Sequence, residues 1–206
     1  MDRVCIIGDS ITHGTGDETL LGWAGIVFQE HPTITLYNLG VRADTSKLVA
    51  RRWQAEAQAR LPKVQQCGLI FSFGTNDAAA ELQTGIRVEL HESIAYAKNI
   101  LTNAKNWLPS LMIGPIPIID AMQPFHSGVS VFEFNNTRIA TYNAAYRELA
   151  EQLEIPYLDV FNSLKTNRTW IASQTSNDGV HPKHDGYQVL ADLIKAWTAF
   201  QRFVAI

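Results

Sequence analysis

The chain has 206 residues, of which 46% are hydrophobic and 18% are charged, and its formal net charge is −3. This composition is typical of a globular protein, and the length allows a large core without disulfides, so we expect one domain over residues 1–206. A weakly acidic chain without a run of lysines and arginines argues against nucleic acid and anionic membranes as partners.

The cysteines and the N-terminal segment bear on the cellular compartment. Cys5 and Cys67 each lie in or beside an apolar run, which predicts buried free thiols rather than a disulfide. The chain begins with a strand-like pattern instead of the basic and apolar regions of a signal peptide, and no apolar run reaches transmembrane length. We therefore expect a cytoplasmic protein without a transmembrane segment. The sequence does not decide between a monomer and a homo-oligomer.

Apolar, strand-like runs alternate along the chain with segments of helical periodicity. Strands are predicted at residues 4–7, 34–39, 69–73, 111–114 and 156–160. Helices are predicted at residues 20–28, 45–61, 88–108 and 136–153, followed by a last helix with Asp185 as its N-cap. This alternation predicts an α/β fold with a parallel sheet of about five strands that helices cover on both faces.

Two segments do not fit the alternation of strands and helices. Residues 115–135 contain three prolines and a glycine among apolar residues, and residues 162–180 contain Trp170. Loops of this length in compact domains are often lids or binding loops, so either segment is expected to line a pocket. The aromatic residues Phe125, Phe132 and Phe134 fit a pocket wall and core packing equally well.

Three of the predicted strands are followed closely by residues that could serve a site, namely Ser10, Gly40 and Asn76. Because right-handed crossovers bring the carboxyl ends of parallel strands to one edge of the sheet, these residues should converge there. Asp178 and His181 lie three residues apart just before the last helix, from where their loop can fold over Ser10. One serine, one histidine and one aspartate make up the inventory of a serine hydrolase.

These residue types suit acyl transfer. Ser10 would be the nucleophile, His181 the general base and Asp178 the group that orients the histidine ring. The Ser10 N–H, the Gly40 N–H and the Asn76 side-chain amide would stabilise the oxyanion. Each residue alone has a plainer interpretation: Ser10 fits a helix N-cap, Asn76 an Asx-turn and Asp178 a turn. Only their combination favours catalysis.

The chain resembles the SGNH or GDSL hydrolase superfamily, and four sequence blocks in the family's order carry the resemblance. They are Gly8-Asp9-Ser10-Ile11, Asn38-Leu39-Gly40, Gly74-Thr75-Asn76-Asp77 and Asp178-Gly179-Val180-His181-Pro182. The resemblance implies a flavodoxin-like sheet in a three-layer α/β/α sandwich. It also implies hydrolysis of esters or thioesters through an acyl-serine intermediate, without a metal or cofactor. The chain departs from the family pattern at Arg42-Ala43-Asp44, where a second glycine is common.

Two other functional classes stay open at this stage. The turn from Ser10 to Thr15 is rich in hydroxyl groups and glycine, which fits a flavodoxin-like phosphate- or flavin-binding protein, although Asp178 and His181 would then have no role. The other class is an inactive family member that binds carbohydrate. For the hydrolase, the expected substrate is a small to medium acyl ester, with lysophospholipid, thioester, aryl ester and acetylated sugar all open.

Overall fold

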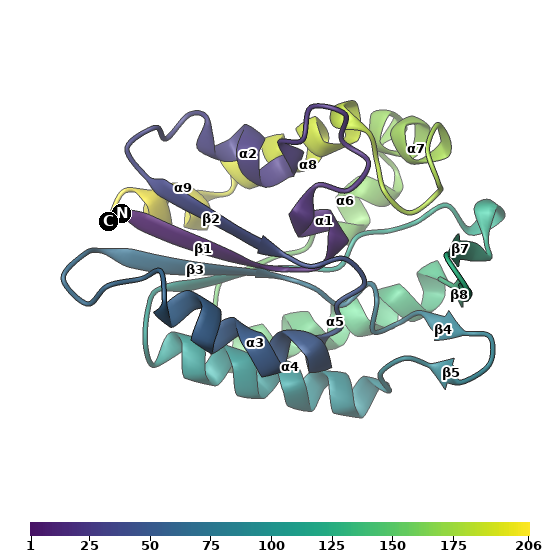
Figure 1. Cartoon of the computed structure of the whole chain (residues 1–206), viewed down its shortest axis with the longest axis horizontal. Helices are drawn as coiled ribbons and strands as arrows, with labels where there is room; N and C mark the ends of the chain where they lie inside the picture. The colour runs from purple at the N-terminus through teal and green to yellow at the C-terminus, as the bar shows by residue number, and fades with distance from the viewer.

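The computed structural model describes residues 1–206 and shows a parallel five-stranded sheet of order β2-β1-β3-β6-β9 between two layers of helices (Figure 1). The strands are β1 (Arg3–Gly8), β2 (Thr35–Gly40), β3 (Cys67–Ser72), β6 (Ser110–Ile113) and β9 (Tyr157–Leu158). All five predicted strands are therefore present, and the predicted α/β architecture is confirmed. The last strand is shorter than expected, since only two residues of the 156–160 segment pair with β6.

The helices form the two outer layers of the sandwich. One layer in Figure 1 contains α1 (Ser10–His13), α2 (Gly22–Phe28), α8 (His184–Ala196) and α9 (Thr198–Val204), with α6 (Phe161–Lys165) and α7 (Arg168–Thr175) at its end. The other layer contains α3 (Ser46–Gln58), α4 (Leu90–Lys105) and α5 (Asn136–Gln152). No helix combines the length and the apolar character that a bilayer crossing requires.

The register of the central strands fixes where the loops emerge. Residues 4–7 of β1 are completely buried, as expected for a strand that is covered on both faces. Gly8 pairs with Gly40 of β2 and with Ser72 of β3, so these three strands end level with one another. The loops that follow them therefore start side by side at the carboxyl edge of the sheet.

A second, antiparallel sheet lies beyond this edge and has the order β5-β4-β8-β7. Its strands are β4 (Ala80–Glu81), β5 (Gly85–Ile86), β7 (Phe125–Ser127) and β8 (Ser130–Glu133). Figure 1 shows it projecting from the carboxyl end of the main sheet. Residues 115–135, expected as a long loop that could line a pocket, therefore contain a hairpin, because β7 and β8 pair with each other and β8 also pairs with β4. The 162–180 segment likewise contains helices, α6 and α7.

The start of α8 also differs from the prediction. The helix begins at His184, its N-cap is Lys183, and Asp185 lies inside the first turn, so Asp185 is not the N-cap. The hydroxyl of Ser173 takes over the capping role, because it accepts hydrogen bonds from the N–H groups of Lys183 and Gly186. A cap supplied from α7 cannot be recognised from the sequence of α8 alone.

Cys5 and Cys67 are both buried and free, which confirms the prediction for the two thiols. Burial raises the pKa of the Cys5 thiol to about 12.

Candidate active site

Ser10 is held at the end of β1 by a tight strand-to-helix turn. A side chain at Gly8 would collide with Ser72 and Thr12, so the chain can pass this point only with glycine. Asp9 caps α1, since its Oδ1 accepts a hydrogen bond of 2.9 Å from the N–H of Ile11. Ser10 is the first residue of α1, where a backbone N–H has no acceptor within the helix.

The structure brings Ser10, His181 and Asp178 together in one hydrogen-bonded chain. The Nε2 atom of His181 lies 2.8 Å from the Oγ of Ser10, and its Nδ1 lies 2.7 Å from the Oδ2 of Asp178. Burial of Asp178 acts to raise the pKa of its carboxyl, but hydrogen bonds and charge from His181 outweigh burial, so the pKa lies below its usual value. Asp178 therefore stays ionised beside the histidine ring.

The loop that carries His181 is fixed by its own hydrogen bonds. The Oδ1 of Asp178 accepts from the N–H groups of Val180 and His181, at 2.9 and 2.7 Å. Gly179 between them has φ +81°, a conformation that glycine adopts without strain. The side chain of Gln174 donates to the carbonyl of Val180 at 2.7 Å. These contacts orient the histidine toward Ser10.

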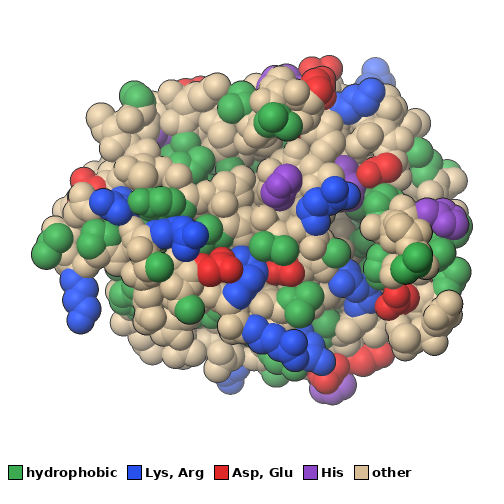
Figure 2. Space-filling view, viewed as in Figure 1, with side chains coloured by type: hydrophobic (Ala, Val, Ile, Leu, Met, Phe, Trp, Pro, Cys, Tyr) green, Lys and Arg blue, Asp and Glu red, His purple; other side chains and the backbone are tan.

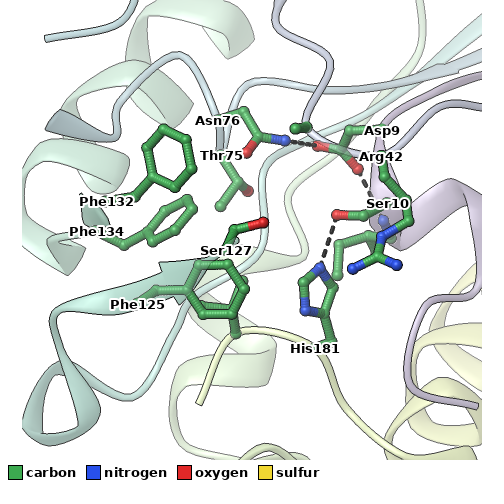
Figure 3. A pocket seen from close by; sticks show the side chains of 13 residues that line it. Asp9, Ser10, Arg42, Thr75, Asn76, Phe125, Ser127, Phe132, Phe134 and His181 are labelled. Atoms are coloured by element: carbon green, nitrogen blue, oxygen red, sulfur yellow. Dashed lines mark hydrogen bonds between the residues drawn. The ribbon is translucent and has the colours of Figure 1, made fainter. Parts of the chain in front are cut away.

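Asn76 points into the same cavity from the loop after β3 (Figure 3). Its Nδ2 donates to the Oδ2 of Asp9 at 3.3 Å, and its Oδ1 accepts from Arg87 at 3.1 Å. The neighbouring Asp77 faces the core instead and accepts from the backbone N–H of Ser46 at 2.9 Å. Burial raises the pKa of the Asp9 carboxyl to about 6.

The structure places Gly40 differently from the expectation. Its N–H donates to the Oδ1 of Asn38 at 3.0 Å, and a Cβ on Gly40 would lie 2.2 Å from the backbone nitrogen of His13. Glycine is therefore required here for the close approach of α1, and Gly40 is not among the residues that line the cavity. Ala43 lines it instead, with φ +66° and with no hydrogen bond from its N–H to any part of the chain.

The cavity over Ser10 has a volume of about 100 Å³ and an aromatic wall. Phe125, Phe132 and Phe134 form that wall opposite Ser10 and His181 (Figure 3). Trp170, for which a pocket position was also open, is fully buried in the core and does not line the cavity. On the face of the molecule drawn in Figure 2, cationic and anionic side chains are interspersed, and neither sign forms a large patch.

The sequence analysis did not single out Arg87. This residue follows β5, outside all four blocks, and its guanidinium reaches both Asn76 and the carbonyl oxygen of Ala43. Nothing in the local sequence marks it, because an arginine after a short strand is ordinary. The position of Arg87 beside Asn76 becomes visible only in the structure, where the N–H of Arg87 donates to the carbonyl of Ala79.

A family model for GDSL-like lipases and acylhydrolases matches residues 6–189. The chain belongs to this GDSL-like Lipase/Acylhydrolase family. The predicted family is thereby confirmed, and the match spans all four sequence blocks. Membership of the GDSL-like family supports hydrolase activity. No curated protein sequence matches the chain.

Solved structures of lipolytic proteins and esterases share the fold at low sequence identity. A lipase/acylhydrolase from Enterococcus faecalis is similar with a TM-score of 0.72 and 20% identity, over 100% of this chain and 96% of that one. The psychrotrophic esterase EstA from Pseudoalteromonas sp., in a structure inhibited by monoethylphosphonate, is similar with a TM-score of 0.69 and 12% identity over 100% of both chains. A member of the lipolytic G-D-S-L family from Veillonella parvula is similar with a TM-score of 0.71 and 18% identity, over 95% of this chain and 98% of that one.

Proposed function

We propose that the chain is a single hydrolase domain that cleaves small to medium acyl esters through an acyl-serine intermediate. The observation that carries this proposal is the continuous hydrogen-bonded chain from Ser10 through His181 to Asp178. Nucleophile and base lie within hydrogen-bonding reach, and a third group orients the base, as serine-based acyl transfer requires. The phosphonate-inhibited esterase with the same fold lends support, since phosphonates imitate tetrahedral acyl intermediates.

In the proposed acylation step, His181 takes the hydroxyl proton of Ser10 while the Oγ attacks the ester carbonyl carbon. The ionised Asp178 stabilises the imidazolium that forms, because it accepts the hydrogen bond from Nδ1. The imidazolium then gives its proton to the departing alcohol, and the acyl group remains on Ser10. In deacylation a water molecule gives a proton to His181 and attacks the acyl group, which releases the acid and restores the serine hydroxyl.

For the oxyanion we propose three donors: the N–H of Ser10, the Nδ2 of Asn76 and the N–H of Ala43. Ala43 takes the place expected for Gly40, since the Gly40 N–H is already bonded to Asn38 while the Ala43 N–H is free. Asn76 uses one Nδ2 hydrogen toward Asp9 and has a second one available to substrate.

The aromatic wall supports a preference for short acyl chains. A cavity of about 100 Å³ bounded by Phe125, Phe132 and Phe134 leaves little room for a long alkyl chain. We therefore expect acetate and butyrate esters to react faster than octanoate esters. The leaving group would lie toward His181, from which it receives its proton.

Hydrolysis of p-nitrophenyl acetate, butyrate and octanoate by wild type and Ser10→Ala, side by side, tests the proposed function. We expect turnover by wild type, a loss of about 10⁴-fold or more in the variant, and a circular dichroism spectrum that does not change. Equal rates in both proteins would overturn the assignment of Ser10. Failure of wild type to cleave any ester, together with no labelling of Ser10 by a fluorophosphonate, would favour the carbohydrate-binding alternative, and a bound yellow cofactor would favour the flavin-binding one.

A further inference from the structure

Arg87 joins two of the loops that supply the proposed oxyanion donors. Its Nη1 donates to the Oδ1 of Asn76 at 3.1 Å, and its Nη2 donates to the carbonyl oxygen of Ala43 at 2.7 Å. One planar guanidinium therefore bridges the loop after β3 and the loop after β2. No other side chain in the protein bonds to both residues.

The backbone of Arg87 is attached to the turn that carries Asn76. The N–H of Arg87 donates to the carbonyl of Ala79 at 2.9 Å, and the N–H of the following Val88 donates to the carbonyl of Asp77 at 3.4 Å. On its other side the guanidinium lies over the ring of Phe132, 4.9 Å from the ring centroid. The backbone hydrogen bonds and the stacking on Phe132 restrict the conformations of Arg87, so its guanidinium is held at its two acceptors.

These contacts decide which end of the Asn76 amide faces the substrate. A guanidinium offers only donors, so the atom of Asn76 that it contacts must be the carbonyl oxygen Oδ1. The Nδ2 then lies on the other side of the amide, where Asp9 accepts one of its hydrogens. A positive charge on Oδ1 also polarises the amide and makes Nδ2 a stronger hydrogen-bond donor.

We propose that Arg87 is a positioning residue that orients and polarises the oxyanion donors of the esterase. This inference rests on the proposed function, and it goes beyond it because Arg87 lies outside the four sequence blocks. Arg87 does not act on the substrate directly. It holds the Asn76 amide with Nδ2 toward the cavity and fixes the carbonyl of Ala43, whose own N–H is the neighbouring donor.

The test compares Arg87→Gln and Arg87→Lys with Arg3→Gln, using p-nitrophenyl acetate as the substrate. Arg3 is a matched control, since its guanidinium also bonds one side chain and one backbone carbonyl, at the opposite end of β1 from Ser10. We expect Arg87→Gln to lower kcat roughly 10- to 100-fold with KM within about threefold, because the oxyanion forms only after binding. Arg87→Lys should recover part of kcat, and Arg3→Gln should keep it.

A double-mutant cycle separates positioning from general stability. In an Asn76→Ala background, Arg87→Gln should lower kcat much less than it does in wild type, because the amide that Arg87 orients is already absent. The acid limb of the pH–rate profile should stay at the same pH, since the base is untouched. The rate of fluorophosphonate labelling of Ser10 should fall in parallel with kcat.

Three results would overturn the proposal for Arg87. They are a folded Arg87→Gln variant with kcat within about twofold of wild type, a loss seen only in KM, and an undiminished loss in the Asn76→Ala background. Failure of the proposed function would look different, since wild type itself would then cleave no ester and Ser10 would not label.

Discussion

The Nε2 atom of His181 lies 2.8 Å from the Oγ of Ser10, although 171 positions separate the two residues in the chain. The fold closes this distance because β1 is an interior strand, between β2 and β3, and α8, which follows His181, packs against α2. The contact that carries the proposed chemistry therefore depends on how the last helix docks. Substitutions that loosen α8 should reduce turnover before they unfold the sheet.

Replacing Asn76 with alanine tests the side-chain donor of the oxyanion hole. Asn76→Ala should lower kcat about 10²- to 10³-fold and leave KM nearly unchanged, because the lost hydrogen bond is strongest in the transition state. Steady-state kinetics with p-nitrophenyl acetate measure both constants. Unchanged kcat would remove Asn76 from the proposed oxyanion hole.

The buried carboxyl of Asp9 should make stability depend on pH in an unusual direction. Burial raises its pKa from 3.8 to about 6, so between these values the folded protein binds more protons than the unfolded chain. The contribution of Asp9 is therefore greatest below about pH 4 and is lost as pH rises through about 6. The free energy of unfolding of wild type, relative to Asp9→Asn, should fall by about 2 kcal/mol between pH 4 and 7, as measured by urea denaturation.

Asp178→Asn is the matched control for this pH dependence. The pKa of Asp178 lies below its usual value, so its stabilisation is present at neutral pH and is lost as pH falls. The two aspartates should thus give pH trends of opposite sign. A pH-independent difference between wild type and Asp9→Asn would contradict the raised pKa of Asp9.

The left-handed backbone of Ala43 predicts a stabilising substitution. Ala43 has φ +66°, which costs an L-residue about 1 kcal/mol relative to glycine. Ala43→Gly should therefore raise the melting temperature by about 2–4 °C while the N–H remains in place and activity is kept. The control is Ala55→Gly, at an exposed site inside α3, which should lower the melting temperature because glycine disfavours a helix. A lower melting temperature for Ala43→Gly would contradict the strain at this position.

The aromatic wall predicts a change in chain-length preference. Phe125 packs edge-on against both His181 and Phe134, at centroid distances of 5.8 and 6.0 Å. Phe125→Ala should enlarge the cavity and raise the butyrate-to-acetate ratio of kcat/KM by roughly tenfold. The control is His126→Ala, because His126 is the exposed neighbour on β7. An unchanged ratio would place the acyl group elsewhere.

Much of the fold follows from local patterns that the sequence displays. The buried runs of β1 and β3 are apolar on both faces, so their positions were predicted to within two residues. The hairpin of β7 and β8 was missed because its strands have three and four residues, too few for a periodic pattern to appear. The start of α8 was misplaced because its capping hydroxyl belongs to Ser173 on another helix.

The candidate site was predictable where residue type and strand order both point to it. Ser10, Asn76, Asp178 and His181 have functional groups that suit the chemistry, and the structure brings them to one cavity or, for Asp178, directly behind it. Backbone donors carry no such signal, because every residue except proline has an N–H. The sequence analysis therefore chose the N–H of Gly40 as an oxyanion donor, whereas in the structure the N–H of Ala43 is the one without a hydrogen bond.

The aromatic wall and the catalytic chain belong to different sheets, and this separation has an evolutionary consequence. Phe125 and Phe132 are carried by the small antiparallel sheet, whereas Ser10 and Asn76 follow strands of the central one. The hairpin can therefore lengthen, shorten or be exchanged without disturbing the register of the main sheet, as long as Phe132 keeps its contact with Arg87. New substrate ranges are accessible to this scaffold by grafting hairpins onto an unaltered reaction centre.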